Sequence, residues 1–202
     1  SFYLQQPINN MNSKPVYIIE HLEKELFEWC LIEYEHISHF VGKENLWFTN
    51  IKNKDDFKKL EKLGKVFFES IRKIKLDNAC ILDPEAKKIL EPKETYPYII
   101  FGGILGDYPP KKRTEIELTR FLSNAEKRNI GKEQMSTDNA VYTVKQIAEK
   151  GKNFSELKFI NKNDIKINEF ETVELPYKYN LVNGKPFMSS KIVKYLKKKK
   201  GF

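Results

Sequence analysis

Short apolar segments recur along this chain, and longer polar segments with helical spacing separate them. Four apolar segments have the length and the β-branched or aromatic character of buried strands. They are Val16–Ile19, Leu46–Thr49, Ala79–Leu82 and Tyr98–Phe101. Strands that are buried on both faces have continuous apolar sequences, so the pattern predicts a parallel sheet with helices on both sides. The expected fold class is therefore α/β with a mostly parallel sheet.

Three segments show helical periodicity, and a glycine follows each of them. We expect these helices over residues 22–41, 55–63 and 137–150, the last capped by Ser136 or Thr137. In the first helix, Leu22 and Trp29 share an apolar face, and Glu33 belongs to the polar face. Residues 67–74 and 116–123 fit either a strand or a helix, and residues 158–173 alternate in a way that predicts added strands.

Length and composition favour one domain with a real core, because 40% of the 202 residues are hydrophobic. No apolar run approaches the ~20 residues of a membrane span, and the first ten residues contain no secretory signal. Two cysteines are too few for a disulfide framework. We expect a cytoplasmic protein without membrane contact. It should have a flexible extension at residues 1–15, one domain at 16–190 and a Lys-rich tail at 191–202.

The net charge of +8 favours polyanionic partners such as RNA or a ribosome. Only four of the 36 basic residues are arginines, namely Arg72, Arg113, Arg120 and Arg128. The lysines are spread along the whole chain, so a solvated lysine surface explains the charge equally well. The charge therefore does not identify a partner.

The most informative segment is 101–110, with the sequence FGGILGDYPP. Two glycines directly after a strand, a third glycine and a rigid Pro-Pro produce an irregular loop in which backbone groups can contact a flat ligand. The segment matches neither the dinucleotide-binding nor the phosphate-binding glycine motif. In a parallel sheet, ligands lie at the carboxyl ends of strands, so the loops at 83–84, 102–103 and 129–131 are expected to meet at one site. An ordinary tight turn and an ordinary helix start remain open alternatives.

Other catalytic chemistry has little support in the sequence. His21, His36 and His39 have no metal-ligand spacing, so we expect no metal site. Neither Cys30 nor Cys80 has a base partner in the sequence. Several carboxylates stand beside the loops, and each alone is more typical of a solvated surface.

A set of segments in order along residues 16–188 carries a family resemblance. They are Tyr17–His21 with Glu28-Trp29, Leu82–Pro84, Phe101–Asp107 with Pro109-Pro110 and Arg113, Gln134-Met135 with Thr137-Asp138, Leu175-Pro176 with Tyr179, and Gly184–Pro186. With these segments the chain resembles the SPOUT-class methyltransferases. Within that class it is similar to the archaeal and eukaryotic branch that includes a fungal protein-arginine methyltransferase of a small-subunit ribosomal protein. Asn129 departs from the pattern, because a second arginine is expected there.

The resemblance implies a C-terminal trefoil knot and the cofactor S-adenosyl-L-methionine, with S-adenosyl-L-homocysteine as the product. The loops 102–107 and 130–135 would wrap the cofactor, and the helix from Thr137 would thread the knot. The residues implied in cofactor binding are Leu82, Phe101, Gly102, Gly103, Leu105, Gly106, Asp107, Ile130, Gly131 and Met135.

The resemblance also implies methylation of an arginine side chain in a ribosomal protein. A guanidinium is protonated at neutral pH, so carboxylates must orient it and it must lose a proton. The catalytic candidates are Glu20, Asp107 and Asp138. We expect a monomer rather than a dimer, with possible rRNA contact through the lysines. Two alternatives remain open: an RNA methyltransferase that acts on rRNA or tRNA, and a non-catalytic module that binds ribosomes.

Overall fold

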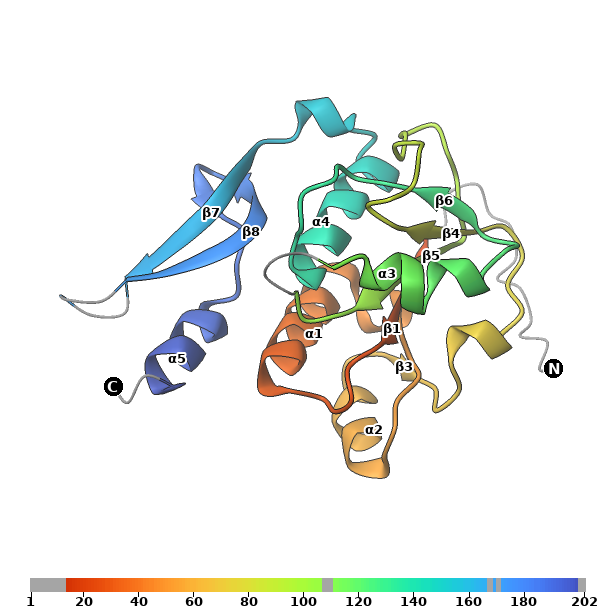
Figure 1. The fold of residues 1–202 in the computed structure, drawn as a ribbon, viewed down its shortest axis with the longest axis horizontal. Helices are drawn as coiled ribbons and strands as arrows, with labels where there is room; N and C mark the ends of the chain where they lie inside the picture. Colours follow the sequence, from red (N-terminus) through yellow and green to blue (C-terminus); the bar gives the residue numbers. More distant parts are fainter. Residues whose placement is uncertain (1–13, 107–110, 167–168, 170–171, 200–202) are drawn as a thin grey trace.

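The structure is a computed structural model that describes residues 14–106, 111–166, 169 and 172–199. Its main sheet has six strands in the order β3-β2-β1-β5-β4-β6, and all neighbours are parallel (Figure 1). The strands are β1 (Val16–His21), β2 (Leu46–Thr49), β3 (Lys65–Val66), β4 (Ala79–Leu82), β5 (Tyr98–Gly103) and β6 (Glu126–Arg128). The predicted α/β class and the four predicted strands are confirmed. The short strands β3 and β6 were not predicted, because neither contains an apolar run.

Side chains of β1 alternate between two cores, one on each face of the sheet. Tyr17 and Ile19 belong to the larger core, which contains residues of α1 (Glu28–Val41), α2 (Lys54–Leu60) and α4 (Thr137–Ala148). Ile18 belongs to the smaller core on the other face, together with Leu118. All three β1 side chains are fully buried, and each such burial contributes roughly 1.5–3 kcal/mol.

Short helical turns complete the cover of the sheet. They are η1 (Lys43–Asn45), η2 (Ile71–Lys73), α3 (Arg113–Glu117), η3 (Thr119–Phe121) and η4 (Phe154–Glu156). The segment 67–74, ambiguous in sequence, follows β3 and ends in η2, and the segment 116–123 contains the end of α3 and η3. Among the described residues, no helix is both long and apolar enough to cross a membrane.

The first helix begins at Glu28 rather than near Leu22, so the prediction of its start was wrong. Tertiary contacts hold the preceding segment in a loop. The Glu23 carboxylate accepts a hydrogen bond from Leu105 N at 2.9 Å, and Leu26 N donates one to Asp56 Oδ2 at 3.4 Å. The predicted end is confirmed, because Gly42 follows the helix with a φ of +88°.

The C-terminal part forms a second, antiparallel sheet with a helix beside it. It comprises β7 (Phe159–Lys166), β8 (Thr172–Val182), β9 (Lys185–Pro186) and α5 (Ser190–Lys199). The predicted added strands are therefore present, in a sheet of their own. Figure 1 shows this unit on the far side of α1 and α4 from the main sheet. Helix α5 lies in the predicted Lys-rich tail, where Ile192 is buried and Tyr195 packs edge-on against Trp29 of α1.

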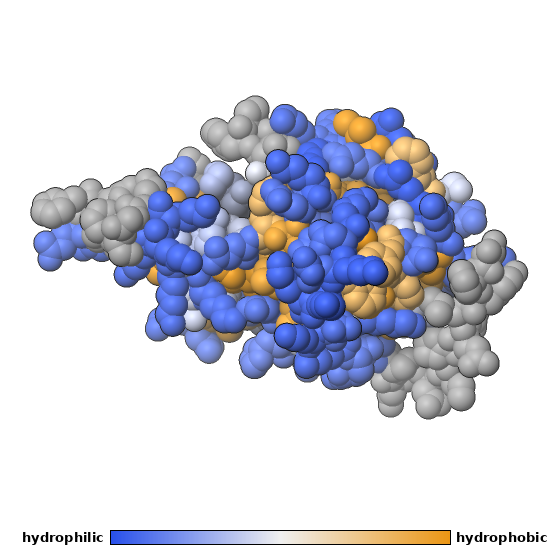
Figure 2. Space-filling view, turned by 90° about the horizontal axis from the view of Figure 1, so that it is seen from below, coloured by the Kyte–Doolittle hydropathy of each residue, from blue (hydrophilic) through white to orange (hydrophobic). Residues whose placement is uncertain are grey.

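Buried amide and hydroxyl groups fasten the C-terminal unit to α4. Asn180 of β8 donates its backbone N–H to Asn139 Oδ1 at 2.9 Å and its side-chain amide to Thr143 Oγ1 at 3.0 Å. Asn139 also donates to Phe187 O at 2.9 Å. Each buried polar group in this network thus has a partner, which fixes the hairpin in one position. On the face shown in Figure 2, hydrophilic residues predominate and apolar residues emerge in patches near the middle.

Candidate functional site

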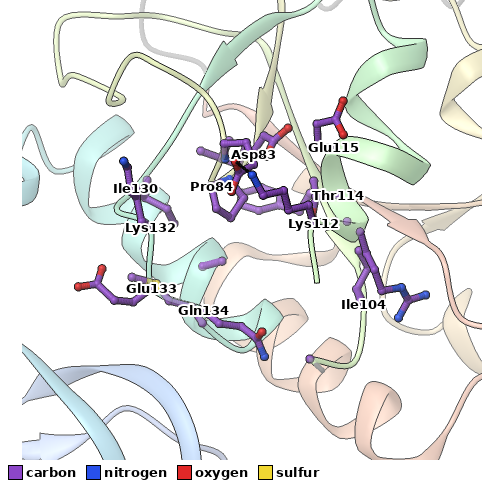
Figure 3. A pocket seen from close by; sticks show the side chains of 18 of the residues that line it. Asp83, Pro84, Ile104, Lys112, Thr114, Glu115, Ile130, Lys132, Glu133 and Gln134 are labelled. Atoms are coloured by element: carbon purple, nitrogen blue, oxygen red, sulfur yellow. Dashed lines mark hydrogen bonds and ion pairs between the residues drawn. The ribbon is translucent and has the colours of Figure 1, made fainter. Parts of the chain in front are cut away.

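A cavity of about 260 Å³ opens beyond the carboxyl ends of β4 and β5. Three loops line it, as Figure 3 shows: Asp83 and Pro84 follow β4, Ile104 follows β5, and Ile130 to Gln134 precede α4. The segment 111–115 closes a further side. The structure therefore brings together the three loops that the sequence pointed to, as a parallel sheet requires.

Most of the residues that were expected to bind a cofactor line this cavity. They are Leu82, Phe101, Gly102, Gly106, Ile130, Gly131 and Met135. Gly103 and Leu105 stand outside the lining, and Asp107 lies outside the described residues. The walls are mainly apolar, while charged residues such as Lys112, Glu115 and Glu133 stand around them. Such a cavity suits a flat organic ligand with a charged end.

The adjacent glycines at the end of β5 face different surroundings. A Cβ on Gly102 would lie 3.1 Å from Ile104 Cδ1 and 3.4 Å from Thr114 Oγ1, and both of these residues line the cavity. A Cβ on Gly103 would lie 2.3 Å from Tyr34 Oη, inside the larger core. Gly103 is thus required for packing, whereas Gly102 leaves room in the cavity.

The loop that follows β5, residues 104–106, is held in place from two sides. Glu23 binds Leu105 N and also pairs with Arg113 at 2.8 Å. Gly106 packs so closely against Gln134 that a Cβ would lie 1.8 Å from its Nε2 atom. The loop after β5 and the loop before α4 therefore touch one another, and both depend on partners elsewhere in the chain.

Glu20 ends β1 and does not line the cavity. Its Oε2 accepts hydrogen bonds from Thr49 Oγ1 at 2.5 Å and from Ile71 N at 2.9 Å, and its Oε1 accepts one from Ser70 Oγ. The side chain is 1% exposed. These contacts give Glu20 a clear role in joining β1 to β2 and η2. Its catalytic role stays a prediction.

Asp138 stands at the start of α4, next to Thr137, which lines the cavity. Its Oδ1 accepts hydrogen bonds from Ser136 Oγ at 2.6 Å and from Asn139 N at 2.8 Å. Its Oδ2 lies 2.7 Å from His36 Nδ1 of α1. Asp138 is thus a buried residue in contact with His36. Its catalytic role also stays a prediction.

A second carboxylate, Glu33 of α1, lies behind the same wall. It accepts hydrogen bonds from Trp29 Nε1 at 2.6 Å and from Thr137 N at 3.2 Å. Burial, and then the nearby charge of Asp138, raise the pKa of Glu33 to about 8. A carboxyl group with a pKa near neutrality can take up and release a proton during a reaction at pH 7.

Sequence reasoning placed Glu33 on the polar face of its helix, and this was wrong. Glu33 is 5% exposed, and it stands three residues after buried Cys30 and four before buried Ile37. That spacing puts all three on one helical face, so the signal was present but outweighed by the residue type. No group of residues capable of holding a metal ion occurs in the described part of the chain. Burial raises the pKa of both thiols, Cys30 and Cys80, to about 12, so both are protonated at neutral pH.

Comparisons with known proteins agree with this geometry. Residues 16–201 match the family model described as "Protein arginine N-methyltransferase SFM1-like". The chain is 34% identical over 200 residues to protein arginine N-methyltransferase SFM1 of Saccharomyces cerevisiae, covering 90% of this chain and 94% of that protein.

Solved structures of similar proteins also match this chain. The crystal structure of yeast SFM1 complexed with SAM matches with a TM-score of 0.84 and 31% identity, covering 95% of this chain and 93% of that one. The SAH complex matches with a TM-score of 0.82 and 31% identity over 89% of this chain and 93% of that one. A dual-specific Trm10 from Thermococcus kodakaraensis matches with a TM-score of 0.54 at 18% identity, over 71% of this chain and 96% of that one, which shows a shared fold alone.

Proposed function

The chain belongs to the SFM1-like family of protein arginine N-methyltransferases, and from this premise we propose that it methylates an arginine side chain of a ribosomal protein with S-adenosyl-L-methionine as the methyl donor. The observation that carries the proposal is the cavity at the ends of β4 and β5, which lies where this fold class binds ligands. The cytoplasm as the place of reaction, a monomeric state and the trefoil knot belong to the same proposal.

The residues of the cavity fit the cofactor. Phe101, Ile130 and Met135 give apolar walls for an adenine ring, and Gly102 adds no side chain to fill the space. The volume of about 260 Å³ is close to the ~300 Å³ at the small end of ligand pockets. S-adenosyl-L-methionine supplies an activated methyl group when it is bound, so the work of the protein is mainly alignment.

The carboxylates beside Thr137 suit an arginine substrate. Glu33 and Asp138 place two buried carboxyl groups behind the cavity wall, and the raised pKa of about 8 keeps most of Glu33 protonated at pH 7. The ionised form of Glu33, whose share grows as the pH rises towards 8, can take the proton that the guanidinium loses. The indole of Trp29 and the N–H of Thr137 hold its two oxygens in place.

A labelling experiment tests the proposal. The purified protein is incubated with donor carrying a tritiated methyl group and with small ribosomal subunits. Label is then partitioned between protein and RNA, and protein hydrolysates are analysed for methylarginine by mass spectrometry. We expect label in methylarginine. A Gly102→Val variant, whose side chain enters the cavity, should lose labelling and S-adenosyl-L-homocysteine binding together. A Phe121→Ala variant, changed at a side chain outside the cavity that is 52% exposed, is the matched control.

The other outcomes identify the alternatives. Label in rRNA or tRNA instead of protein would make the chain an RNA methyltransferase. Binding to ribosomes without any transfer, and without thermal stabilisation by S-adenosyl-L-homocysteine, would make it a non-catalytic module.

A further inference from the structure

Helix α5 has one face made of lysines. Five of its ten residues are lysines, and none is acidic. Lys191, Lys194 and Lys198 follow one another at spacings of three and four residues, so they lie on one side of the helix, and Lys197 is next to them. All four are exposed, and together they are called the lysine face below. The row is about 10 Å long, because a helix rises about 1.5 Å per residue.

The apolar face of α5 is already covered by the protein itself. The helix lies beside α1, as Figure 1 shows, and its Tyr195 meets Trp29 edge-on at 5.8 Å. Ile192 is 3% exposed, while Val193 and Leu196 pack against a core formed by residues of β7 and β8. A helix that enters a lipid surface needs a free apolar face, so the covered face disfavours a membrane as the partner of α5.

The protein compensates the charge of the lysine face only in part. Lys191 pairs with Glu35 of α1, whereas the other three lysines of the face form no ion pair with any residue that the structure describes. Glu28 also lines the cavity between α1 and α5, so two carboxylates of α1 stand against four lysines. The helix dipole favours lysines in the last turn, but Lys191 and Lys194 precede that turn. The face therefore keeps an excess of positive charge, which attracts a polyanion.

We propose that the lysine face docks the enzyme on the phosphate backbone of ribosomal RNA. The inference deepens the proposed function and rests on it, because a ribosomal protein in its subunit lies beside RNA. A lysine ammonium is a point charge and lacks the planar fork with which arginine forms paired hydrogen bonds. The face therefore binds phosphates without regard to base sequence, and it holds the enzyme close to its protein substrate.

Two triple variants with the same loss of charge test the proposal. The first replaces three lysines of the face: Lys194→Gln, Lys197→Gln and Lys198→Gln. The second is the matched control and replaces three exposed lysines in or next to α2: Lys54→Gln, Lys58→Gln and Lys62→Gln. A third variant, with arginine at the three positions of the face, keeps the charge and should behave as the parent protein.

Binding of a fluorescein-labelled oligouridylate is measured by anisotropy over a range of salt concentrations. We expect the first variant to bind about 10- to 100-fold more weakly than the parent protein. Its slope of log affinity against log salt should be shallower by about 2, because each phosphate contact on a single strand contributes about 0.7 to the slope. The control should keep the slope of the parent protein.

Methylarginine formation shows whether docking serves the reaction. With intact small ribosomal subunits as substrate, the first variant should raise KM by about 10-fold and leave kcat unchanged, since the face is needed for binding alone. With RNA-free proteins extracted from the same subunits, the first variant should match the parent protein, because the phosphates are gone.

The proposal is overturned if the first variant binds RNA with the affinity and salt dependence of the parent protein, or if both triple variants lose affinity equally. Vesicles of phosphatidylserine and phosphatidylcholine are a second probe. Stronger binding of the parent protein to these vesicles than to the oligouridylate, lost in the first variant, would assign the face to a membrane and overturn the proposal as well. A parent protein that binds RNA through the face but methylates no arginine would refute the proposed function and support the RNA contact.

Discussion

Glu20 and Glu33 are both buried glutamates, but their surroundings differ in one decisive respect. Glu20 accepts hydrogen bonds from two hydroxyls and one backbone N–H. Glu33 accepts hydrogen bonds from an indole and a backbone N–H, and it lies near a second carboxylate, Asp138. A buried carboxylate that has neutral donors and no second carboxylate beside it holds elements together. One that shares its site with another carboxylate can exchange a proton.

The largest expected effect comes from neutralising Glu33 without changing its shape. Glu33→Gln should lower kcat for methylarginine formation by about 10²-fold or more, because the proton acceptor is lost. Binding of S-adenosyl-L-homocysteine, followed by calorimetry, should stay within about 3-fold of the parent protein, since Glu33 lies behind the cavity wall. Glu28→Gln, an exposed change on the same helix, is the control. Full turnover in Glu33→Gln would show that Glu33, like Glu20, is not needed for proton transfer.

Removing the Glu20 side chain should act on stability first. Glu20→Ala leaves three donors without their acceptor, and we expect the free energy of unfolding to fall by about 2–3 kcal/mol. Urea denaturation measures this loss. If the protein stays as stable as the parent and loses turnover instead, Glu20 is the catalytic group that the sequence suggested.

Gly102 and Gly103 of β5 allow a second comparison, between a residue at the cavity and a residue packed in the core. Gly103→Ala places a methyl group against Tyr34 Oη and Ile19, and should cost about 1–3 kcal/mol of stability. Gly102→Ala should leave stability nearly unchanged and weaken S-adenosyl-L-homocysteine binding, because its methyl group points towards Ile104 and Thr114. Thermal melting and calorimetry on both variants measure the two effects. Equal losses of stability would show that the two positions are not distinct.

The smallest effect is a dependence of stability on pH. The pKa of Glu33 is about 8 in the folded chain, against 4.5 for a free glutamate, so the folded state holds a proton that the unfolded state has lost. Between these two values the contribution of Glu33 to stability falls as the pH rises, by about 1 kcal/mol per pH unit. Urea denaturation at pH 5, 6 and 7 should show this slope in the parent protein and a flatter one in Glu33→Gln. Parallel slopes would mean that Glu33 is ionised throughout.

Much of the main sheet could be read from the sequence, because continuous apolar runs are a strong signal for strands buried on both faces. The start of α1 could not, since Glu23 and Leu26 form hydrogen bonds with Leu105 and Asp56, which are far away in the sequence. Local pattern carries no information about such partners. The loops around the cavity were also predictable, because strand ends in a parallel sheet meet at one edge.

Individual side chains at the site were harder to predict. Gly102 and Gly103 have the same residue type, and only the alternation of β5 sends one towards the cavity and the other into the core. Glu33 had the right spacing for burial, but a carboxylate is usually exposed. Its raised pKa depends on burial and on the charge of Asp138 on another helix, which the local sequence does not show. Asp107 lies outside the described residues, so its predicted role is untouched by the structure.

The backbone hydrogen bond from Lys178 N to Gln134 O, 2.8 Å long, joins β8 to the loop that lines the cavity. A molecule that steadies this loop will therefore slow amide hydrogen exchange in β8 as well. Thermodynamic linkage is reciprocal: a molecule whose binding to the hairpin is strengthened by a ligand in the cavity strengthens the binding of that ligand by the same factor.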